Sequence, residues 1–502
     1  MTRHVDVLII GAGLSGIGMA CHLTREQGDR SYLILERRTA IGGTWDLFRY
    51  PGIRSDSDMY TFGYGFRPWL GTKVLADGPA IRAYIEQTAA EYGVTDHIRF
   101  GRKVTAVRWS GAQGVWTAEA LDEQTGQTET YTANFLVGCT GYYDYDQGYR
   151  PTFPGEEDFA GTIVHPQHWP EDLDYRGKRV VVIGSGATAI TLIPAMCSDA
   201  AHVTMVQRSP TYIAALPADD PVAVGLKRAK VPAALAYRAG RARNIALQRA
   251  SYQLSRSNPG LSRRLLLAAV RAQVGSGIDM RHFSPSYDPW DQRLCIVPGG
   301  DLFKALRSGR ASIVTDHIET FTETGIRLRS GAELPADIVV SATGLTLQML
   351  GGAELEVDGQ MLATRDLVSY KGALLGTVPN AMIVLGYTNA SWTLKADLAA
   401  EYFCRLLAHM RTHGYTRFVA VPEPEDRSPE SIMGGTLTSG YVQRGDAVAP
   451  RQGARGPWRV INNYFRDRAL LRRGPIEDGI LRFGRDRAAE PAADRPAAVP
   501  TR

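Results

Sequence analysis

Three glycines near the amino terminus have the spacing of a phosphate-binding turn. Gly11, Gly13 and Gly16 form G-x-G-x-x-G between the apolar run VDVLII and a stretch rich in small residues. Such a turn lets backbone N–H groups approach a pyrophosphate at the start of a helix. Glu36 follows at the end of the apolar run SYLILE, where a carboxylate can accept hydrogen bonds from ribose hydroxyls. A lone glycine motif is commonly a structural turn, but strand, helix and acid together predict a dinucleotide site. The sequence GGTW at 42–45 indicates FAD.

A second turn of the same type occurs in the middle of the chain. Gly184, Gly186 and Ala189 form G-x-G-x-x-A after the apolar run VVVI. The position that corresponds to Glu36 holds Arg208, and a guanidinium there can bind the 2′-phosphate that distinguishes NADPH from NADH. Ser209 could add a hydrogen bond to the same phosphate. The alternative is that Arg208 is a solvated surface cation.

The stretch FAGTIVHPQHWP, residues 159–170, carries two histidines and could be a metal site, a catalytic base or a hinge. A zinc site needs three or four ligands, and His165 and His168 have no third ligand at usable spacing. We therefore predict no metal and favour a hinge. The five cysteines contain no C-x-x-C pair, which argues against a redox dithiol and against a zinc site.

These residues must be positioned by an α/β fold. Apolar strands alternate with longer amphipathic runs along the 502 residues, and the nucleotide-binding pattern is present twice, so we expect two Rossmann-like dinucleotide-binding domains with a helical insertion. The insertion is marked by residues 221–277, which hold eleven Lys or Arg and no Asp or Glu. The rest of the chain holds 46 basic and 52 acidic residues, so this segment accounts for the net charge of +5.

The insertion has two interpretations. A cationic amphipathic helix can contact an anionic membrane surface, or it can cap a substrate channel with its apolar face, and we favour the cap. No nucleic-acid recognition motif accompanies the basic residues. The amino terminus lacks the pattern of a secretory signal and no long uncharged apolar run occurs, so we expect a cytoplasmic protein. The Ala-, Pro- and Arg-rich end, 485–502, is expected to be a disordered tail.

Two longer motifs resemble the fingerprints of a known family. GGTWDLFRYPGIRSDSDMY has the spacing G-x-W-x4-Y-P-x4-D, and Phe159, Gly161, His165 and Trp169 have the spacing F-x-G-x3-H-x3-W-P. Both match the type I Baeyer-Villiger monooxygenases without a gap. In detail, GYTNASWTLKADL and DPWDQR make the chain similar to the ethionamide-activating monooxygenases of mycobacteria. The resemblance extends from about residue 3 to about residue 485.

The resemblance implies roles for particular residues. Arg293 in DPWDQR matches the family's catalytic arginine, and Asp56 matches its aspartate partner. The second fingerprint looks like a linker that couples the FAD and NADPH domains. Many family members have lysine at the position of Gln292, so NADPH selection here would depend on Arg208. The expected cofactor contacts in the first fingerprint are Gly43, Thr44, Trp45 and Asp56. Trp45, Tyr50, Asn389 and Trp392 could line the flavin or substrate cavity or belong to the core.

The resemblance also implies a reaction and a division of the chain. A C4a-peroxyflavin would convert ketones to esters or lactones with O2, and would also oxidise sulfur in thioethers or thioamides. The alternatives are a flavin monooxygenase restricted to nitrogen or sulfur, or an NADPH-dependent flavin reductase. The expected segments are an FAD-binding domain at 1–143 and 336–484, an NADP-binding domain at 144–214 and 279–335, and the helical insertion at 215–278.

Overall fold

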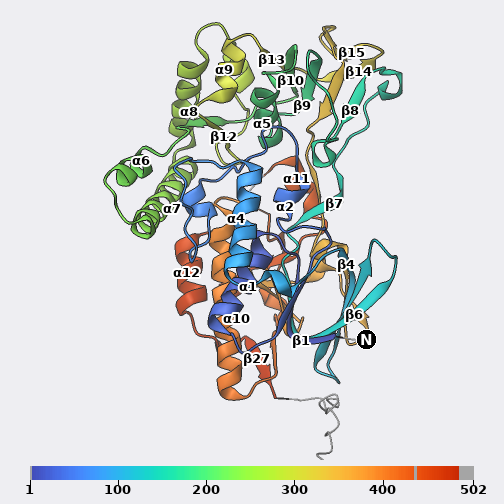
Figure 1. Ribbon diagram of the computed structural model, residues 1–502, viewed down its shortest axis with the longest axis vertical. Helices are drawn as coiled ribbons and strands as arrows, with labels where there is room; N and C mark the ends of the chain where they lie inside the picture. Colours follow the sequence, from blue (N-terminus) through green and yellow to red (C-terminus); the bar gives the residue numbers. More distant parts are fainter. Residues whose placement is uncertain (1–2, 435–437, 486–502) are drawn as a thin grey trace, which may run out of the picture.

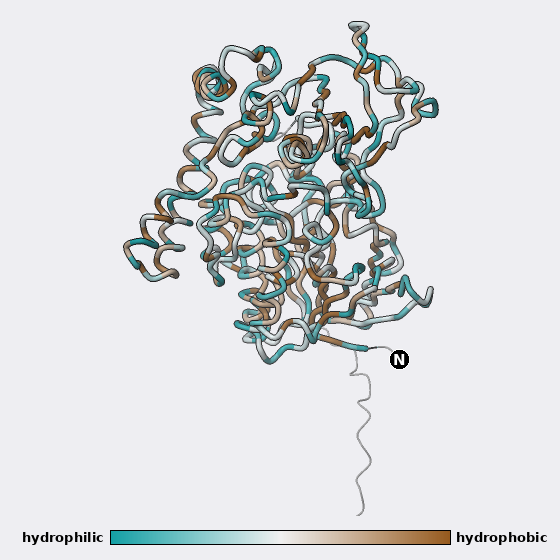
Figure 2. The backbone as a smooth tube through the Cα atoms, turned by 45° about the horizontal axis from the view of Figure 1, so that its top comes forward, coloured by the Kyte–Doolittle hydropathy of each residue, from teal (hydrophilic) through white to brown (hydrophobic). Residues whose placement is uncertain are grey.

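The computed structural model describes residues 3–434 and 438–485 and has two lobes stacked along its long axis (Figure 1). The predicted tail from 485 lies, apart from its first residue, outside the described residues. None of the helices in the described ranges is both long and apolar enough to cross a bilayer. Figure 2 shows hydrophobic segments in the strands inside both lobes, and also along helices that project from the side of the molecule.

The lower lobe contains an eleven-stranded sheet, with β1 hydrogen-bonded in parallel between β6 and β2. Successive side chains of β1 point to opposite faces. Val7 and Ile9 pack under helices, whereas Leu8 and Ile10 pack in a second core on the other face. The strands are β1 (Arg3–Ile10), β2 (Tyr32–Leu35), β3 (Ile98–Arg99), β4 (Arg102–Ser110), β5 (Val115–Asp122), β6 (Thr128–Gly138), β19 (Glu354–Val357), β20 (Gln360–Met361), β21 (Ser369–Tyr370), β22 (Leu374–Leu375) and β23 (Ala381–Ile383).

The principal helices of this lobe cover one face of the sheet, and the longest of them comes from the end of the chain. They are α1 (Leu14–Glu26), α4 (Gly78–Glu91), α10 (Trp392–His413) and α12 (Tyr464–Arg473). α1 and α10 share the largest buried core. The first and last parts of the chain therefore build one lobe together.

The upper lobe contains a five-stranded parallel sheet in the order β13-β10-β9-β17-β8. Its strands are β8 (Thr162–Val164), β9 (Arg179–Ile183), β10 (His202–Gln207), β13 (Ala311–Thr315) and β17 (Ile338–Ser341), and α5 (Ala187–Met196) and α9 (Asp301–Arg307) pack on it. The predicted segment boundary at residue 336 is wrong, because β17 pairs with β9 and β8 inside this sheet. An apolar run such as IVVS has the same pattern in either sheet, so its partner could not be predicted from the sequence.

Two chain crossings connect the lobes, and they pair with each other. β7 (Tyr143–Gly148) leaves the lower lobe, and β18 (Leu345–Leu347) returns to it as the antiparallel partner of β7. The basic segment forms α6 (Pro221–Arg228), α7 (Ala233–Ser257) and α8 (Pro259–Val274), which project on the left of Figure 1.

The remaining α-helices and strands are short, and they lie between the two lobes or at their edges. They are α2 (Thr44–Leu47), α3 (Met59–Phe62), α11 (Gly440–Gly445), β11 (Ile213–Leu216), β12 (Cys295–Pro298), β14 (Ile318–Thr322), β15 (Gly325–Leu328), β16 (Glu333–Pro335), β24 (Arg417–Ala420), β25 (Arg427–Ser431), β26 (Arg451–Gly453) and β27 (Leu481–Gly484).

Candidate active site

A cavity of about 880 Å³ reaches both glycine turns, at the carboxyl ends of β1 and β9. Ligands of α/β proteins bind at this edge of a parallel sheet. The predicted site residues in the cavity wall are Gly11, Gly13, Glu36, Gly43, Thr44, Trp45, Asp56, Gly184, Gly186, Arg208, Ser209 and Arg293. The fold therefore brings residues from both halves of the sequence to one cavity.

The first turn is packed so closely that side chains would not fit. Gly11 has φ +102°, and a Cβ there would lie 2.8 Å from the carbonyl oxygen of Cys139. A Cβ on Gly16 would lie 1.8 Å from the carbonyl oxygen of Gly11, so Gly16 serves the close packing of α1 and is not part of the wall. Gly13 caps α1 and pairs with Gly42. The start of a thirteen-residue helix thus faces the cavity, where its dipole favours an anion.

Glu36 is buried behind this turn and is held by two backbone donors. The N–H groups of Ala12 and Arg38 donate to its two carboxylate oxygens at 2.6 and 2.7 Å. Burial raises the pKa of Glu36, and these two N–H groups oppose that rise. Each carboxylate oxygen can accept a second hydrogen bond, so Glu36 can bind ribose hydroxyls while it holds the turn.

The second turn repeats the first with one difference. Gly184 has φ +133°, and a Cβ there would lie 2.4 Å from the carbonyl oxygen of Ala342. A Cβ on Gly186 would meet no atom within 4 Å, so the space beside Gly186 is open to a ligand. Ala189 is buried in the core and is not part of the wall.

Arg208 follows β10 and is exposed at the cavity. Within residues 3–434 and 438–485 it has no carboxylate partner. Beside it, the carbonyl oxygen of Ser209 accepts a hydrogen bond from the Ser185 hydroxyl at 3.0 Å. The guanidinium of Arg208 is thus available to an anion bound at the second turn.

Arg293 and Asp56 form an ion pair in the cavity wall. The Arg293 Nε lies 2.7 Å from the Asp56 Oδ2, and the Arg293 Nη1 donates to the Thr388 carbonyl at 3.2 Å. Asp56 precedes α3 and Arg293 precedes β12, so the two lobes each contribute one partner. The Arg293 side chain is 29% exposed, which leaves part of the guanidinium open to the cavity.

Three tyrosines that were not predicted as site residues line the cavity around this cation. Burial alone would lower the pKa of Arg293, but Asp56 and the phenols of Tyr441, Tyr142 and Tyr143 outweigh it and raise the pKa. All three tyrosines line the cavity, and burial raises the pKa of each phenol. Tyr142 and Tyr143 come soon after the end of β6, in VGCTGYY, but nothing local marks Tyr441.

Of the four residues that were expected either to line the cavity or to belong to the core, three are in the cavity wall. Trp45, Tyr50 and Trp392 line the cavity. Trp392 donates from Nε1 to the Ser15 hydroxyl at 2.8 Å, which fixes its ring over the start of α1. Asn389 is not part of the wall, because its amide donates to the Asn462 carbonyl at 3.0 Å.

The second fingerprint lies outside the wall, at the crossing between the lobes. The Nε2 of His165 donates to the carbonyl of Gly344 at 3.2 Å, and its Nδ1 accepts from the N–H of Gln167. Burial lowers the pKa of His165. Phe159 is buried against Phe321, and a Cβ on Gly161 would lie 2.5 Å from the Phe159 ring. Trp169 packs against the core of the upper lobe.

One group of described side chains has a ligand spacing that would suit a metal ion. Among residues 3–434 and 438–485, the group with suitable ligand spacing is His409, His413 and Glu477, near the end of α10 and away from the cavity wall. All five cysteines are buried and free.

Comparisons with known proteins agree with this arrangement. A family model described as flavin-binding monooxygenase-like matches residues 75–224, and one described as an NAD(P)-binding Rossmann-like domain matches residues 9–87. The chain is 57% identical to the putative FAD-containing monooxygenase MymA of Mycobacterium tuberculosis over 488 residues, covering 96% of this chain and 98% of that protein.

Two further likenesses cover nearly the whole chain. It is 52% identical to the FAD-containing monooxygenase EthA of Mycobacterium tuberculosis over 487 residues, covering 97% of this chain and 99% of that protein. Its fold matches a structure of an oxidised steroid monooxygenase bound to NADP, with a TM-score of 0.74, 22% identity, and coverage of 96% of this chain and 99% of that one.

Proposed function

Because the chain belongs to the FAD-containing monooxygenases, we propose that it is an NADPH-dependent Baeyer-Villiger monooxygenase that converts ketones to esters or lactones. The ion pair of Arg293 with Asp56 in the cavity wall carries this proposal. The same site would oxidise sulfur in thioethers or thioamides.

The residues of the cavity fit two dinucleotides. FAD would be held in the lower lobe by the Gly11 to Gly16 turn and by Glu36, whose buried carboxylate faces the cavity. NADPH would be held in the upper lobe by the turn at Gly184 and Gly186, with its 2′-phosphate on Arg208. When bound, FAD that has been reduced by NADPH activates O2 and supplies one oxygen atom to the substrate.

Arg293 supplies a permanent positive charge where negative charge develops. An arginine keeps its charge at any pH that the protein meets, and Asp56 with the Thr388 carbonyl fixes the orientation of the guanidinium. A cation placed in advance stabilises the charge that develops on a ketone oxygen during attack, without reorganisation at that moment. A heteroatom oxygenase has no carbonyl oxygen to stabilise and would not need this pair.

The tyrosines around Arg293 add aromatic ring surface to its surroundings without adding negative charge. Tyr142 packs against Trp392 with ring centroids 5.2 Å apart, and its phenol stays neutral because burial holds its pKa well above the usual value. Exclusion of water strengthens the interaction of Arg293 with an anion. It also limits the loss of activated oxygen as hydrogen peroxide.

The overall reaction consumes one ketone, one O2, one NADPH and one proton. One oxygen atom enters the bond between the carbonyl carbon and its neighbour, and the other leaves as water with NADP⁺. We therefore propose product analysis of the FAD-loaded protein with NADPH, ¹⁸O2, linear and aryl ketones, and a thioether. An ester with one labelled oxygen is the expected product, and labelled sulfoxide should accompany it with the thioether.

The variant Arg293→Ala tests the role of the cation. Ester formation should fall about a hundredfold or more, as expected when a charge-stabilising donor is removed, while FAD absorbance is retained. Arg179→Ala is a matched control, because Arg179 also forms an arginine-aspartate pair, with Asp337, but lies outside the cavity wall.

In the product analysis of the unchanged protein, sulfoxide without ester would assign the protein to heteroatom oxygenation. NADPH consumption with only peroxide as product would indicate a flavin reductase.

A further inference from the structure

The projecting helices α6, α7 and α8 present an apolar surface to solvent. Residues 221–277 include six of the eleven large hydrophobic side chains that are exposed in the described part of the chain. These six are between 42% and 60% exposed, and they are Val222, Leu235, Leu247, Leu254, Leu261 and Leu265. We call them the exposed leucine face. No residue of 221–277 lines the large cavity, so the segment is not the cap over the site that the sequence suggested.

The pattern along α7 makes this face continuous. Ala239, Ala242, Ala246 and Ala250 are exposed between Leu235 and Leu254, at intervals of three or four residues that place them on one side of a helix. On α8, Leu261 and Leu265 are followed by exposed Ala268 and Ala272 at the same intervals. A solvent-facing side of a surface helix is ordinarily polar, so this side needs a partner.

The opposite side of α7 is fixed to the lower lobe. The Tyr237 hydroxyl donates to the Tyr64 carbonyl at 3.0 Å, and the Arg241 guanidinium donates to the Gly63 carbonyl at 2.6 Å. Further along, the side-chain amide of Asn244 donates to Asp58 at 2.7 Å. These contacts hold α7 in one rotation, so the leucines cannot turn inward.

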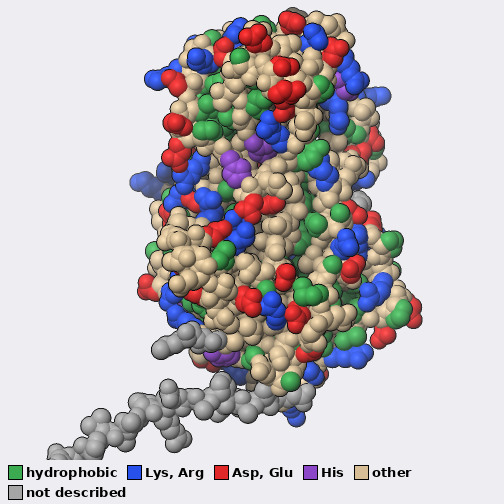
Figure 3. All heavy atoms as spheres, turned by 90° about the vertical axis from the view of Figure 1, so that its right-hand side faces the viewer, with side chains coloured by type: hydrophobic (Ala, Val, Ile, Leu, Met, Phe, Trp, Pro, Cys, Tyr) green, Lys and Arg blue, Asp and Glu red, His purple; other side chains and the backbone are tan. Residues whose placement is uncertain are grey.

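Cations border the exposed leucine face. Three of the segment's arginines pair with carboxylates outside it, at Asp397, Asp220 and Asp291. Six other basic residues are exposed without a carboxylate partner among the described residues, and they are Lys227, Arg228, Lys230, Arg238, Arg264 and Arg271. The side of the molecule turned away from these helices instead carries cations and anions side by side (Figure 3).

We propose that α6, α7 and α8 dock on an anionic membrane surface, with the exposed leucine face entering the lipid and the six cations on its headgroups. An amphipathic helix binds such a surface when apolar side chains lie among Lys and Arg. The long Arg and Lys side chains can reach the headgroups while the leucines are buried. A second copy of the chain fits this face less well. Both surfaces would then be positively charged, and residues 221–277 hold no Asp or Glu that could pair with the cations of the other copy.

Docking on this face would bring the Arg293 loop close to the lipid. Arg256 of α7 pairs with Asp291 at 2.8 Å, and the ring of Tyr252 lies 5.4 Å from that of Trp290. Both partners belong to the DPWDQR loop. If the proposed function holds, on which this step rests, the substrates are ketones that partition into a bilayer and reach the cavity from it.

Vesicle co-sedimentation of the full, FAD-loaded chain tests the docking without any reaction. The chain should sediment with vesicles of phosphatidylcholine mixed with phosphatidylglycerol, more weakly at high salt, and little with phosphatidylcholine alone. The exposed double variant Leu247→Ser/Leu265→Ser should bind the mixed vesicles about tenfold more weakly or worse. Arg238→Glu/Arg264→Glu should lose the preference for the anionic lipid.

The control is Met361→Ser, because Met361 is as exposed as Leu265 but lies on β20, paired with Glu356 of β19. It should bind like the unchanged chain. Equal sedimentation of all variants, or none with anionic vesicles, would overturn the proposal. A dimer in lipid-free solution that Leu247→Ser/Leu265→Ser dissociates would also overturn it and assign the face to a second copy.

Turnover tests the substrate step separately. The leucine variant should lose activity on a long-chain ketone dissolved in vesicles but keep activity on a water-soluble ketone. Vesicle binding without activity on either ketone would leave the docking standing and contradict the proposed reaction instead.

Discussion

We propose that Arg208 is the residue that discriminates between NADPH and NADH. It occupies the position where an acid would bind a ribose 2′-hydroxyl, and it is exposed at the cavity without a carboxylate partner in the described residues. Gln292 also lines the cavity but carries no charge. The discrimination between NADPH and NADH should therefore depend mainly on one guanidinium.

Replacing this side chain gives a residue-scale prediction. In Arg208→Ala, the KM for NADPH should rise about 10- to 100-fold, because a hydrogen bond between charged groups contributes about 1.5–3 kcal/mol. The KM for NADH should change little, and steady-state kinetics with both nucleotides measures the difference. Arg329→Ala removes an exposed arginine of the same lobe outside the cavity and should change neither value. An equal loss with both nucleotides would contradict the assignment.

The candidate site could be predicted from the sequence only where its residues follow local patterns. Gly11, Glu36 and Arg208 stand at fixed distances from a strand end, so their neighbourhood was predictable. Tyr441 raises the pKa of Arg293 although nearly 150 positions separate them, and no spacing in the sequence encodes that they line one cavity. Asn389 shows the converse, since it lies in a family-like motif but bonds to Asn462 outside the wall, which is one of the two alternatives that the sequence left open.

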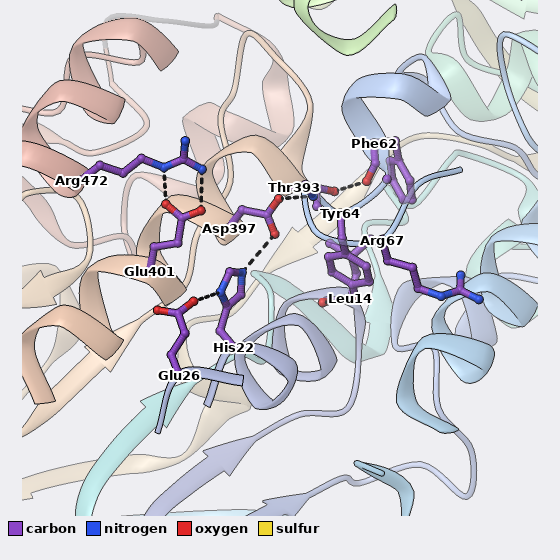
Figure 4. A network of polar contacts seen from close by, with 12 residues as sticks. Leu14, His22, Glu26, Phe62, Tyr64, Arg67, Thr393, Asp397, Glu401 and Arg472 are labelled. Carbon is purple, nitrogen blue, oxygen red and sulfur yellow. Dashed lines mark hydrogen bonds and ion pairs between the residues drawn. The ribbon is translucent and has the colours of Figure 1, made fainter. Parts of the chain in front are cut away.

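At the scale of elements, α1 and α10 are joined by a cluster of charged side chains around the buried His22 (Figure 4). The His22 Nδ1 lies 2.9 Å from Glu26, and its Nε2 lies 3.6 Å from Asp397 on α10. Burial would lower the pKa of His22, but Asp397 and Glu26 outweigh it and raise the pKa to about 9. The imidazole is therefore charged in the folded protein at neutral pH.

This cluster predicts a loss of stability at alkaline pH. A folded-state pKa above the unfolded value of about 6.5 adds stability that is complete below that value and is lost as pH rises through about 9. The full effect is about 3 kcal/mol at 1.36 kcal/mol per pKa unit. In His22→Gln, the fall in melting temperature of the FAD-loaded protein over this pH range should be smaller.

Asp397 keeps Arg241 as a partner in that variant, at 3.2 Å, so the fold should survive. His409→Gln removes a more exposed histidine-glutamate pair, between His409 on α10 and Glu477 after α12. Its melting temperature should follow the unchanged pH profile. An identical pH profile in His22→Gln and in the unchanged protein would show that folding does not raise the pKa of His22.

The presence of each helix or strand was more predictable than the elements with which it pairs or packs. Both strand-turn-helix units and the helical insertion follow from apolar runs, glycines and charge. β17 was assigned to the wrong lobe, because hydrogen bonding to β9 and β8 depends on the whole chain path. The exposed leucine face could not be predicted either, since the side of α7 that packs on the lower lobe is set by residues such as Tyr64 and Gly63 that lie far away in the sequence.

At the scale of the whole molecule, the two lobes must stay aligned because each supplies one partner of the Arg293 and Asp56 pair. The crossings β7 and β18 pair with each other, and the second fingerprint is bonded to both. His165 donates to the carbonyl of Gly344 next to β18, Gln167 donates to the carbonyl of Asp144, and His168 donates to that of Asp146, both in β7. We therefore regard His165 as a positioning residue.

A weaker connection between the two lobes should increase the share of NADPH oxidation that occurs without oxygen insertion. In His165→Ala, the hydrogen bond to Gly344 is lost and the two lobes should be aligned less well. More of the consumed NADPH should then yield hydrogen peroxide. The ratio of ester formed to NADPH consumed measures this, and it should fall severalfold while FAD content and melting temperature stay close to those of the unchanged protein. His165→Gln keeps an N–H donor and should restore part of the ratio. A His165→Ala protein that loses FAD or melts at a lower temperature would indicate a purely structural role. An equal fall in the ratio of ester to NADPH in both variants would show that the hydrogen bond from His165 to Gly344 does not align the lobes.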